Sequence, residues 1–351
     1  MDSLSQAALG AAVGHAIGGR RAGRKAAAWG AALATLPDLD VFIPLGNDVL
    51  EFTSHRSFTH SLPVMAAAAP VLVWALGRLH PQVREDRRRW SVLVLACLWT
   101  HALLDAFTAY GTQLLWPLPA PPVAWSTIFI VDPAYTLPLL AGVIAVLVRP
   151  GRLAHRCNTA GLCLSTAYLL WTAAAQDHVE ELGRRTAVSG GVEVERIMAT
   201  PTPFNSLLWR ILAMTPEGDY LEGYHSLADG VDRPPELRRR AGGRRLLEPL
   251  SESWAVRRLQ WFTGGYYAAR LDGRRVVLVD LRMGLDPLYV FQFVVGEITA
   301  AGAAEPMAVR AGSGGASRSQ LAWVWRRIRD ADAVWVNSGR PPPRIRPERQ
   351  P

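Results

Sequence analysis

The chain has 351 residues, which is long enough for two domains, and half of them are hydrophobic while 19% are charged. Its formal net charge of +8 comes mainly from arginines in short clusters between apolar runs. Membrane topology explains such clusters better than nucleic acid does, so we expect no nucleic-acid partner. The three cysteines lie in apolar runs without a CxxC spacing, which excludes a thiolate metal site or disulfide framework as the organising feature.

The N-terminal half begins with two short apolar runs rich in alanine and glycine. They cover Leu4–Gly19 and Ala26–Leu36, and the basic cluster at 20–25 separates them. Each is shorter than the roughly 20 residues that a membrane crossing requires. Small side chains allow close helix packing, so we predict a short N-terminal helical hairpin packed against other helices.

Longer apolar segments follow, each of a length typical of a membrane-spanning helix. They are Ser61–Leu79, Trp90–Tyr110, Ala134–Val148 and Cys157–Ala175. The basic loops at 78–89 and 149–156 are expected on the cytoplasmic side. We therefore predict an α-helical membrane bundle of about four spans plus the hairpin, in a multi-pass protein of the inner (plasma) membrane whose partner is the lipid bilayer.

Polarity rises abruptly near residue 176, which predicts a change of domain. We expect a membrane domain over 1–175, a mixed, β-rich extramembrane domain over 176–335 on the extracytoplasmic side, and a disordered Pro/Arg-rich tail over 336–351. An Asp-Gly pair at 272–273 between β-rich runs predicts a hairpin. Further along, 288–298 is typical of a strand and 320–328 of a helix.

Ionisable side chains lie inside or beside these apolar segments, where burying them is costly. His101 and Asp105 are four residues apart and share one face of a predicted helix. Hydrogen bonding between two buried polar groups would account for this pair equally well. The case for a metal site comes from its conjunction with His55, His60 and the acidic turn before them.

We predict that these residues converge on a divalent metal ion at the extracytoplasmic face. His55, His60, His101 and Asp105 are the expected ligands, and Asp38 and Asp40 are the expected catalytic residues, either bridging or acting as general base toward water. The mixed nitrogen and oxygen donors suit Zn first, with Mn, Fe or Mg as alternatives, in a one- or two-metal site. Weaker candidates are Asp2, Gln6 and His15.

At these motifs the chain resembles the bacterial inner-membrane proteins known as membrane-bound metal-dependent hydrolases, the YdjM/YbcI type, LexA-regulated and hydrolase-like. The matching pieces are MDSLSQA at 1–7, LPDLD at 36–40, HRSFTHS at 55–61, and HALLD at 101–105 leading into YGTQ at 110–113. The family favours glycine at the position of Ser57 and an acidic residue at that of His15. The resemblance implies an integral membrane protein with metal-dependent hydrolase activity.

The expected function is a membrane-embedded, metal-dependent hydrolase acting through activated water on a membrane-proximal substrate, a phosphoester or lipid-linked compound. One alternative is a non-catalytic scaffold, stress-response protein or small transporter in which the histidines and aspartates are structural. A transport path predicts polar residues through the whole bilayer depth, whereas here they cluster at one end. Another alternative places the function in 176–351, as a binder of envelope polymers with the membrane half as its anchor.

Overall fold

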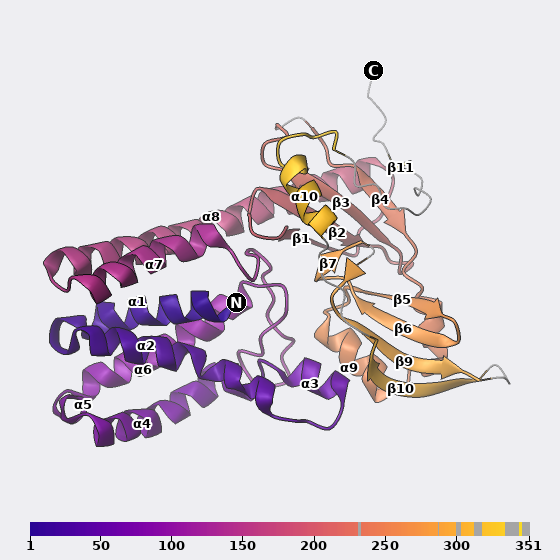
Figure 1. Cartoon of the computed structure of the whole chain (residues 1–351). Helices are drawn as coiled ribbons and strands as arrows, with labels where there is room; N and C mark the ends of the chain where they lie inside the picture. The colour runs from indigo at the N-terminus through magenta and orange to yellow at the C-terminus, as the bar shows by residue number, and fades with distance from the viewer. Residues whose placement is uncertain (231–232, 287, 300–302, 312–317, 334–343, 346–351) are drawn as a thin grey trace. The chain divides into compact units, whose positions relative to one another are not determined.

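The computed structural model describes the chain except residues 231–232, 287, 300–302, 312–317, 334–343 and 346–351. It divides into two compact units (Figure 1), which we call the helical unit and the sheet unit. The helical unit comprises 1–44, 54–125 and 130–171; the sheet unit comprises 45–53, 126–129 and 172–351. The predicted domain limits stay a prediction, and the predicted tail at 336–351 lies outside the described residues apart from Arg344–Ile345.

The helical unit consists of helices that run side by side, joined by turns and two 3-10 helices (Figure 1). Its elements are α1 (Ser3–Ala22), α2 (Arg24–Thr35), η1 (Pro37–Phe42), η2 (Phe58–His60), α4 (Leu62–Leu79), α5 (Pro81–Glu85), α6 (Arg87–Ala106), α7 (Pro133–Val148) and the first part of α8 (Arg152–Ser189). The short helix α3 (Asp48–Ser54) belongs mostly to the sheet unit.

Helices α1 and α2 pack as a tight hairpin because glycines face each other across it. A Cβ atom built on Gly10 would overlap the carbonyl oxygen of Gly30, and one on Gly30 would overlap that of Gly10. Between the helices the chain turns at Gly23, whose positive φ of 54° suits glycine. This close approach fixes where α2 ends, and therefore where η1 begins.

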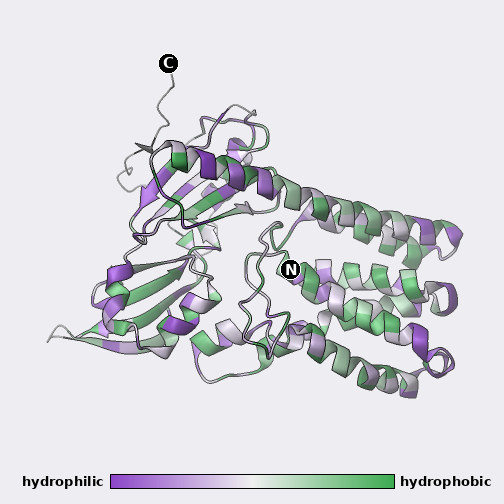
Figure 2. Cartoon of the chain, turned by 180° about the vertical axis from the view of Figure 1, so that it is seen from behind, coloured by the Kyte–Doolittle hydropathy of each residue, from purple (hydrophilic) through white to green (hydrophobic). Residues whose placement is uncertain are grey.

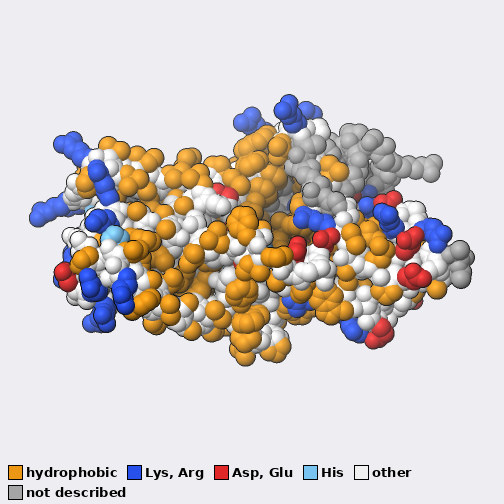
Figure 3. All heavy atoms as spheres, turned by 60° about the horizontal axis from the view of Figure 1, so that its bottom comes forward, with side chains coloured by type: hydrophobic (Ala, Val, Ile, Leu, Met, Phe, Trp, Pro, Cys, Tyr) orange, Lys and Arg blue, Asp and Glu red, His pale blue; other side chains and the backbone are white. Residues whose placement is uncertain are grey.

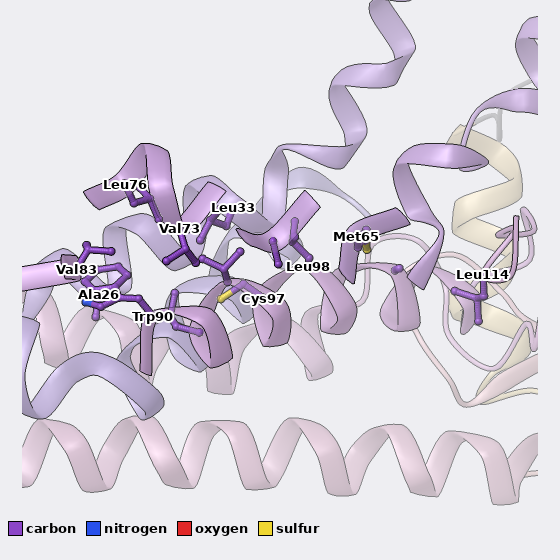
Figure 4. Close-up of a cluster of buried hydrophobic side chains, with 14 of the residues drawn as sticks. Ala26, Leu33, Met65, Val73, Leu76, Val83, Trp90, Cys97, Leu98 and Leu114 are labelled. Atoms are coloured by element: carbon purple, nitrogen blue, oxygen red, sulfur yellow. The ribbon is translucent and has the colours of Figure 1, made fainter. Parts of the chain in front are cut away.

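The core of the helical unit lies between α2, α4 and α6 (Figure 4). Fully buried Leu93, Val94 and Cys97 on α6 meet Val73 and Leu76 on α4. Because α6 packs on both α2 and α4, the ends of these helices are held together. That arrangement places His101 of α6 beside the residue segments that precede α4 and follow α2.

Basic residues gather at one end of the helical unit. They occupy the α1–α2 turn, the α5–α6 region and the start of α8 (Figures 2 and 3). Arg21 pairs with Asp86 at 2.5 Å, and Arg24 donates to the carbonyl of Val148 at 3.1 Å. These contacts tie the three turns into one basic end. Since α6 runs from Arg87 to Ala106, His101 lies about 14 residues, or roughly 21 Å, from that end.

The predicted bundle of about four spans is wrong. Among the described residues only α4, Leu62–Leu79, is a helix long and apolar enough to cross a membrane, judged by length and composition. Helix α7 has 16 residues and so extends about 24 Å, less than a hydrocarbon core of about 30 Å. Helix α6 begins with three arginines and carries His101 and Asp105, so it is not uniformly apolar. The apolar stretch of α8 is interrupted by polar residues, namely Asn158, Thr159, Ser165 and Thr166.

The sheet unit contains two antiparallel sheets. The first has the order β1-β2-β3-β4-β11 and the second β10-β9-β6-β5, with a small β7-β8 pair beside them. Their strands are β1 (Arg196–Pro201), β2 (Leu208–Met214), β3 (Tyr220–Ser226), β4 (Leu237–Arg240), β5 (Tyr267–Asp272), β6 (Arg275–Asp280), β7 (Gly284–Leu285), β8 (Leu288–Tyr289), β9 (Gln292–Ile298), β10 (Ala304–Arg310) and β11 (Arg344–Ile345). The region after α8 is thus rich in sheet.

The end of α8 covers one face of the first sheet, and the second sheet packs against the other face. The end of α8 contributes Val179 and Ala187 to a core with β1 and β2, whereas Met198 and Leu212 face residues of β6 and β9. The remaining elements are η3 (Arg244–Leu250), α9 (Trp254–Phe262) and α10 (Arg318–Arg327). The predicted hairpin at Asp272-Gly273 is confirmed by the pairing of β5 with β6.

Candidate metal centre

Four side chains from three elements meet at the end of the helical unit opposite its basic end. They are Asp38 on η1, His60 on η2, and His101 and Asp105 on α6. One ligand atom from each lies within 4.8 Å of the others. His101 and Asp105 are one helical turn apart, and Pro37 ends α2 so that the next residue can turn toward α6.

The distances within this group are short and similar. The Nε2 atoms of His60 and His101 lie 3.0 Å apart. Asp38 Oδ1 is 3.4 Å from His60 Nε2 and 3.6 Å from His101 Nε2. Asp105 Oδ2 is 3.2 Å and 3.6 Å from the same two nitrogens. Two imidazole nitrogens and two carboxylate oxygens therefore point at one another across a common centre.

The four donors fit a divalent cation. A tetrahedral site with bonds of about 2.0–2.1 Å has ligand atoms about 3.3–3.4 Å apart, and the five measured separations run from 3.0 to 3.6 Å. Asp105 Oδ2 is fully buried and, although Arg56 Nε lies 3.2 Å away, it accepts no hydrogen bond of good geometry among the described residues. A bound cation would satisfy it. The group can therefore hold a metal ion.

The centre is enclosed on most sides. The side chains of His60, His101 and Asp105 are fully buried, whereas that of Asp38 is 23% exposed. Solvent or a substrate would therefore reach the group past η1, where Asp38 lies.

Asp40 is not a member of this group but organises it. One carboxylate oxygen lies 2.7 Å from His55 Nδ1. The other accepts from the backbone N–H of Arg56 at 3.0 Å and from the Thr59 hydroxyl at 2.7 Å. Burial alone would raise the pKa of Asp40, but the hydrogen bond and charge of His55, together with Thr59, outweigh burial and lower it to about 2. Asp40 is therefore an ionised acceptor.

This hydrogen-bond arrangement fixes the tautomer of His60. Thr59 gives its only hydroxyl proton to Asp40, so its oxygen can only accept from His60 Nδ1, which lies 2.9 Å away. With the proton on Nδ1, the Nε2 lone pair of His60 is directed at Asp38, His101 and Asp105. An imidazole held in this way is the typical partner of a metal.

Positive groups surround the carboxylate of Asp105. Arg56 Nε lies 3.2 Å from Oδ2, and the amino group of Met1 pairs with Oδ1. Gln6 donates to the same Oδ1 at 3.0 Å. Arg56 is held in place by a bond to Thr108 at 3.0 Å and has an unusual φ of +62°.

The structure thus assigns positions to all the predicted residues. His60, His101, Asp105 and Asp38 come together, while His55 and Asp40 form an adjacent pair; the roles predicted for these six residues stay predictions. Among the weaker candidates, Gln6 contacts Asp105, Asp2 caps α1, and His15 packs against His155.

Arg56, like the amino group of Met1, contacts Asp105 but was not identified as functional by the sequence patterns. It stands between two recognised histidine positions, and a lone arginine in a polar stretch carries no signal that it will be buried. Its contact with Asp105 depends on a backbone conformation that sequence does not specify.

Comparisons with known proteins agree with the predicted family. The model of the family described as YdjM inner membrane protein matches residues 1–179, just over half of the chain, which confirms the predicted family. The uncharacterized protein YfhP of Bacillus subtilis (strain 168) is 27% identical over 205 residues, which cover 57% of this chain and 60% of YfhP. The match therefore spans less than two thirds of that relative. No solved structure matches the chain.

Proposed function

This chain belongs to the YdjM inner membrane protein family, and on that premise we propose that it is a metal-dependent hydrolase of a membrane-proximal phosphoester. The observation that carries the proposal is the convergence of Asp38, His60, His101 and Asp105 within 4.8 Å. Two imidazoles and two carboxylates favour Zn, with Mn, Fe and Mg as alternatives. A metal ion bound there would polarise the phosphoester and lower the pKa of water at neutral pH.

In this proposal Asp40 and His55 form a proton-transfer pair. Asp40, ionised at neutral pH, accepts from His55 Nδ1 at 2.7 Å and so leaves Nε2 of His55 free to accept a proton. The His55 side chain is 25% exposed, and its ring centre is 6.1 Å from that of His60. These positions support our proposal that His55 acts as a general base beside the centre rather than as the predicted ligand.

The reaction balances without a further reactant. The oxygen of one water molecule bonds to phosphorus, and the bond between phosphorus and the leaving oxygen breaks. The proton lost by water passes to His55 and then to the leaving oxygen. Arg56, whose guanidinium lies against Asp105, keeps positive charge next to the site and so favours an anionic substrate.

The proposed site is at the outer surface of the membrane. His60 lies two residues before Leu62, where α4 begins, and α4 ends near the basic α5–α6 region. The positive-inside rule assigns that basic end to the cytoplasm, so the other end of α4 faces outward. The orientation of the sheet unit stays a prediction.

The test uses the purified full chain in detergent, stripped of metal and then loaded separately with Zn, Mn, Fe or Mg. Hydrolysis of bis(p-nitrophenyl) phosphate is followed by release of p-nitrophenolate. We expect activity with at least one metal and its loss by a factor of about 100 or more in His60→Ala and Asp105→Asn. His178→Ala, which removes an exposed histidine of α8, is the matched control and should retain activity.

His55→Ala separates catalysis from metal binding. We expect it to keep the metal content of the wild-type chain while hydrolysis falls by a factor of about 100 to 10,000, the range typical of a lost general base. Loss of metal from His55→Ala would instead make His55 a ligand. A chain that is folded and metal-loaded but hydrolyses no phosphoester would overturn the proposal.

A further inference from the structure

The turn that carries Asp38 also displays a run of exposed apolar side chains. Leu39, Val41 and Phe42 are 53%, 64% and 79% exposed, and Ile43 follows at 42%. Leaving large apolar side chains in water is unfavourable, and such a run usually marks a surface that meets something apolar. It lies on the side from which the metal centre is accessible, because Asp38 is the exposed member of the group.

Two further segments around the centre carry exposed apolar side chains. The rings of Phe58 on η2 and Trp116 lie 6.2 Å apart, and the Ser61 hydroxyl donates to the carbonyl of Trp116 at 2.6 Å. Both aromatic residues are more than a third exposed. The hydrogen bonds of Asp40 with the 55–59 segment connect η1 to the same assembly. Apolar side chains from η1, η2 and the 115–118 loop therefore belong to the structure that holds the metal-binding group.

We call these exposed side chains the apolar rim; they are Leu39, Val41, Phe42, Ile43, Phe58 and Trp116. The surroundings of the apolar rim point to lipid as its occupant. Helix α4 starts at Leu62, two residues after His60, and only 28% of it is buried within the protein. Its exposed residues include Val71 and Trp74, so its apolar surface is left to face the bilayer. Phe58 and His60 directly precede this candidate span in the chain, and the hydrogen bonds of Asp40 tie η1 to the same segment. The metal-binding group therefore lies at one end of the candidate span.

We propose that the substrate of the metal centre is a membrane lipid with a phosphoester headgroup, whose acyl portion lies against Leu39, Val41 and Phe42. This inference rests on the proposed function and specifies its substrate class. The phosphoester enters past Asp38, while the hydrocarbon chain replaces water on the apolar side chains of η1. In the hydrolysis the oxygen of one water bonds to phosphorus, the phosphorus–oxygen bond to the leaving group breaks, and the leaving oxygen takes up the proton lost by water.

The test compares two phosphodiesters that differ only in their alkyl chain. Hexadecyl and ethyl p-nitrophenyl phosphate are presented in the same mixed micelles to the metal-loaded full chain, and kcat/KM is measured for each. We expect a strong preference for the hexadecyl ester. Phe42→Ser and, independently, Val41→Ser should lower the hexadecyl-to-ethyl ratio by about tenfold, because each removes apolar contact with the chain.

Val188→Ser is the matched control, since Val188 is 61% exposed against 64% for Val41 and lies in the sheet unit. It should leave the ratio unchanged. Equal kcat/KM for the two esters, or a ratio insensitive to both η1 substitutions, would overturn the lipid assignment and leave the hydrolase intact. Failure of the metal-loaded chain to hydrolyse either ester would instead overturn the proposed function, and this inference with it.

A measurement without turnover checks the same contact. A fluorophore attached at Phe42→Cys, with the native cysteines replaced by alanine, is placed in vesicles containing lipids brominated on the acyl chain. We expect quenching by these lipids and little by aqueous iodide, with the reverse at Val188→Cys. Quenching of position 42 by iodide alone would contradict the proposed lipid contact.

Discussion

Thr59 joins the outer hydrogen-bond network to a proposed ligand through one hydroxyl. It donates to Asp40 and accepts from His60, which leaves the Nε2 atom of His60 directed at the centre. Thr59→Val keeps the shape and removes both bonds, so we expect metal affinity to fall by about 10 to 100-fold, as for other partners of metal-bound histidines. Competition with a chromophoric chelator measures this.

Thr59→Ser supplies the matched comparison because it retains the hydroxyl, and it should restore most of the affinity. Thr159→Val removes an exposed threonine whose hydroxyl donates to the carbonyl of His155 within α8, and it should have no effect. Wild-type affinity in Thr59→Val would show that the hydrogen bond does not orient His60.

Asp40 makes the stability of the helical unit sensitive to acid. Its pKa is lowered from an ordinary value of 3.8 to about 2. The folded chain therefore stabilises the ionised form of Asp40. This contribution to the free energy of unfolding is present above about pH 4 and is lost as the pH falls toward 2. We expect the difference in melting temperature between wild type and Asp40→Asn to shrink between pH 5 and pH 2.5.

Thermal unfolding of the full chain in detergent measures that difference. Asp177→Asn, at an exposed position of α8, should give a difference that stays small at every pH. A gap between wild type and Asp40→Asn that stays constant down to pH 2.5 would mean that Asp40 gains nothing from its partners.

The sequence identified the acids and imidazoles of the site but could not divide them into ligands and supporting groups. Asp38 and Asp40 are two residues apart, and the 3-10 turn decides which carboxylate faces α6. His55 and His60 are similarly separated by the left-handed backbone at Arg56. Neither conformation has a signature in the residue types, whereas the i, i+4 spacing of His101 and Asp105 predicts a shared helix face directly.

At the scale of elements, the α1–α2 hairpin depends on the absence of side chains at its crossing. A Cβ on Gly30 would overlap the backbone of Gly10, so the helices must separate. We expect Gly30→Ala to lower the free energy of unfolding by about 1–3 kcal/mol, the usual cost of overpacking. It should also weaken metal binding, because α2 leads into η1 and Asp38.

Gly151→Ala is the control, since a Cβ there meets no atom within 4 Å. Thermal unfolding in detergent and chelator competition report the two effects. Gly30→Ala with wild-type stability would show that the helices accommodate the methyl group and that the close approach is not required.

Helix ends explain why the predicted number of spans was too high. Hydropathy marked apolar stretches correctly, but a stretch is a span only if the helix that contains it is long and uniformly apolar. Asp132 and Pro133 start α7, and Arg149 ends it, after 16 residues. In α6 the apolar run carries the two polar residues of the site. Helix caps and tertiary contacts set these limits, and the hydrophobicity of an apolar stretch does not report either of them.

At the scale of the whole molecule, the sheet unit has its own buried ion pair. Arg210 on β2 donates to Glu222 on β3 at 2.5 Å and to the carbonyl of Leu281 at 2.6 Å. Both side chains are almost fully buried. Glu222→Ala leaves a buried guanidinium without its counterion. We therefore expect the free energy of unfolding of the sheet unit to fall by about 3–5 kcal/mol.

The exposed pair of Glu181 and Arg185 on α8 provides the comparison, and Glu181→Ala should cost about 0.5 kcal/mol or less. Denaturant unfolding followed by tryptophan fluorescence measures both. A small loss in Glu222→Ala would show that water or a neighbouring group replaces the carboxylate.

The most direct test of the central claim is the metal content of the purified full chain. Elemental analysis of the wild type and of His178→Ala should find about one divalent ion per chain, and His60→Ala and His101→Ala should lose it while remaining folded. A wild-type chain that binds none of Zn, Mn, Fe or Mg, or a His60→Ala chain that retains the full amount, would contradict the account.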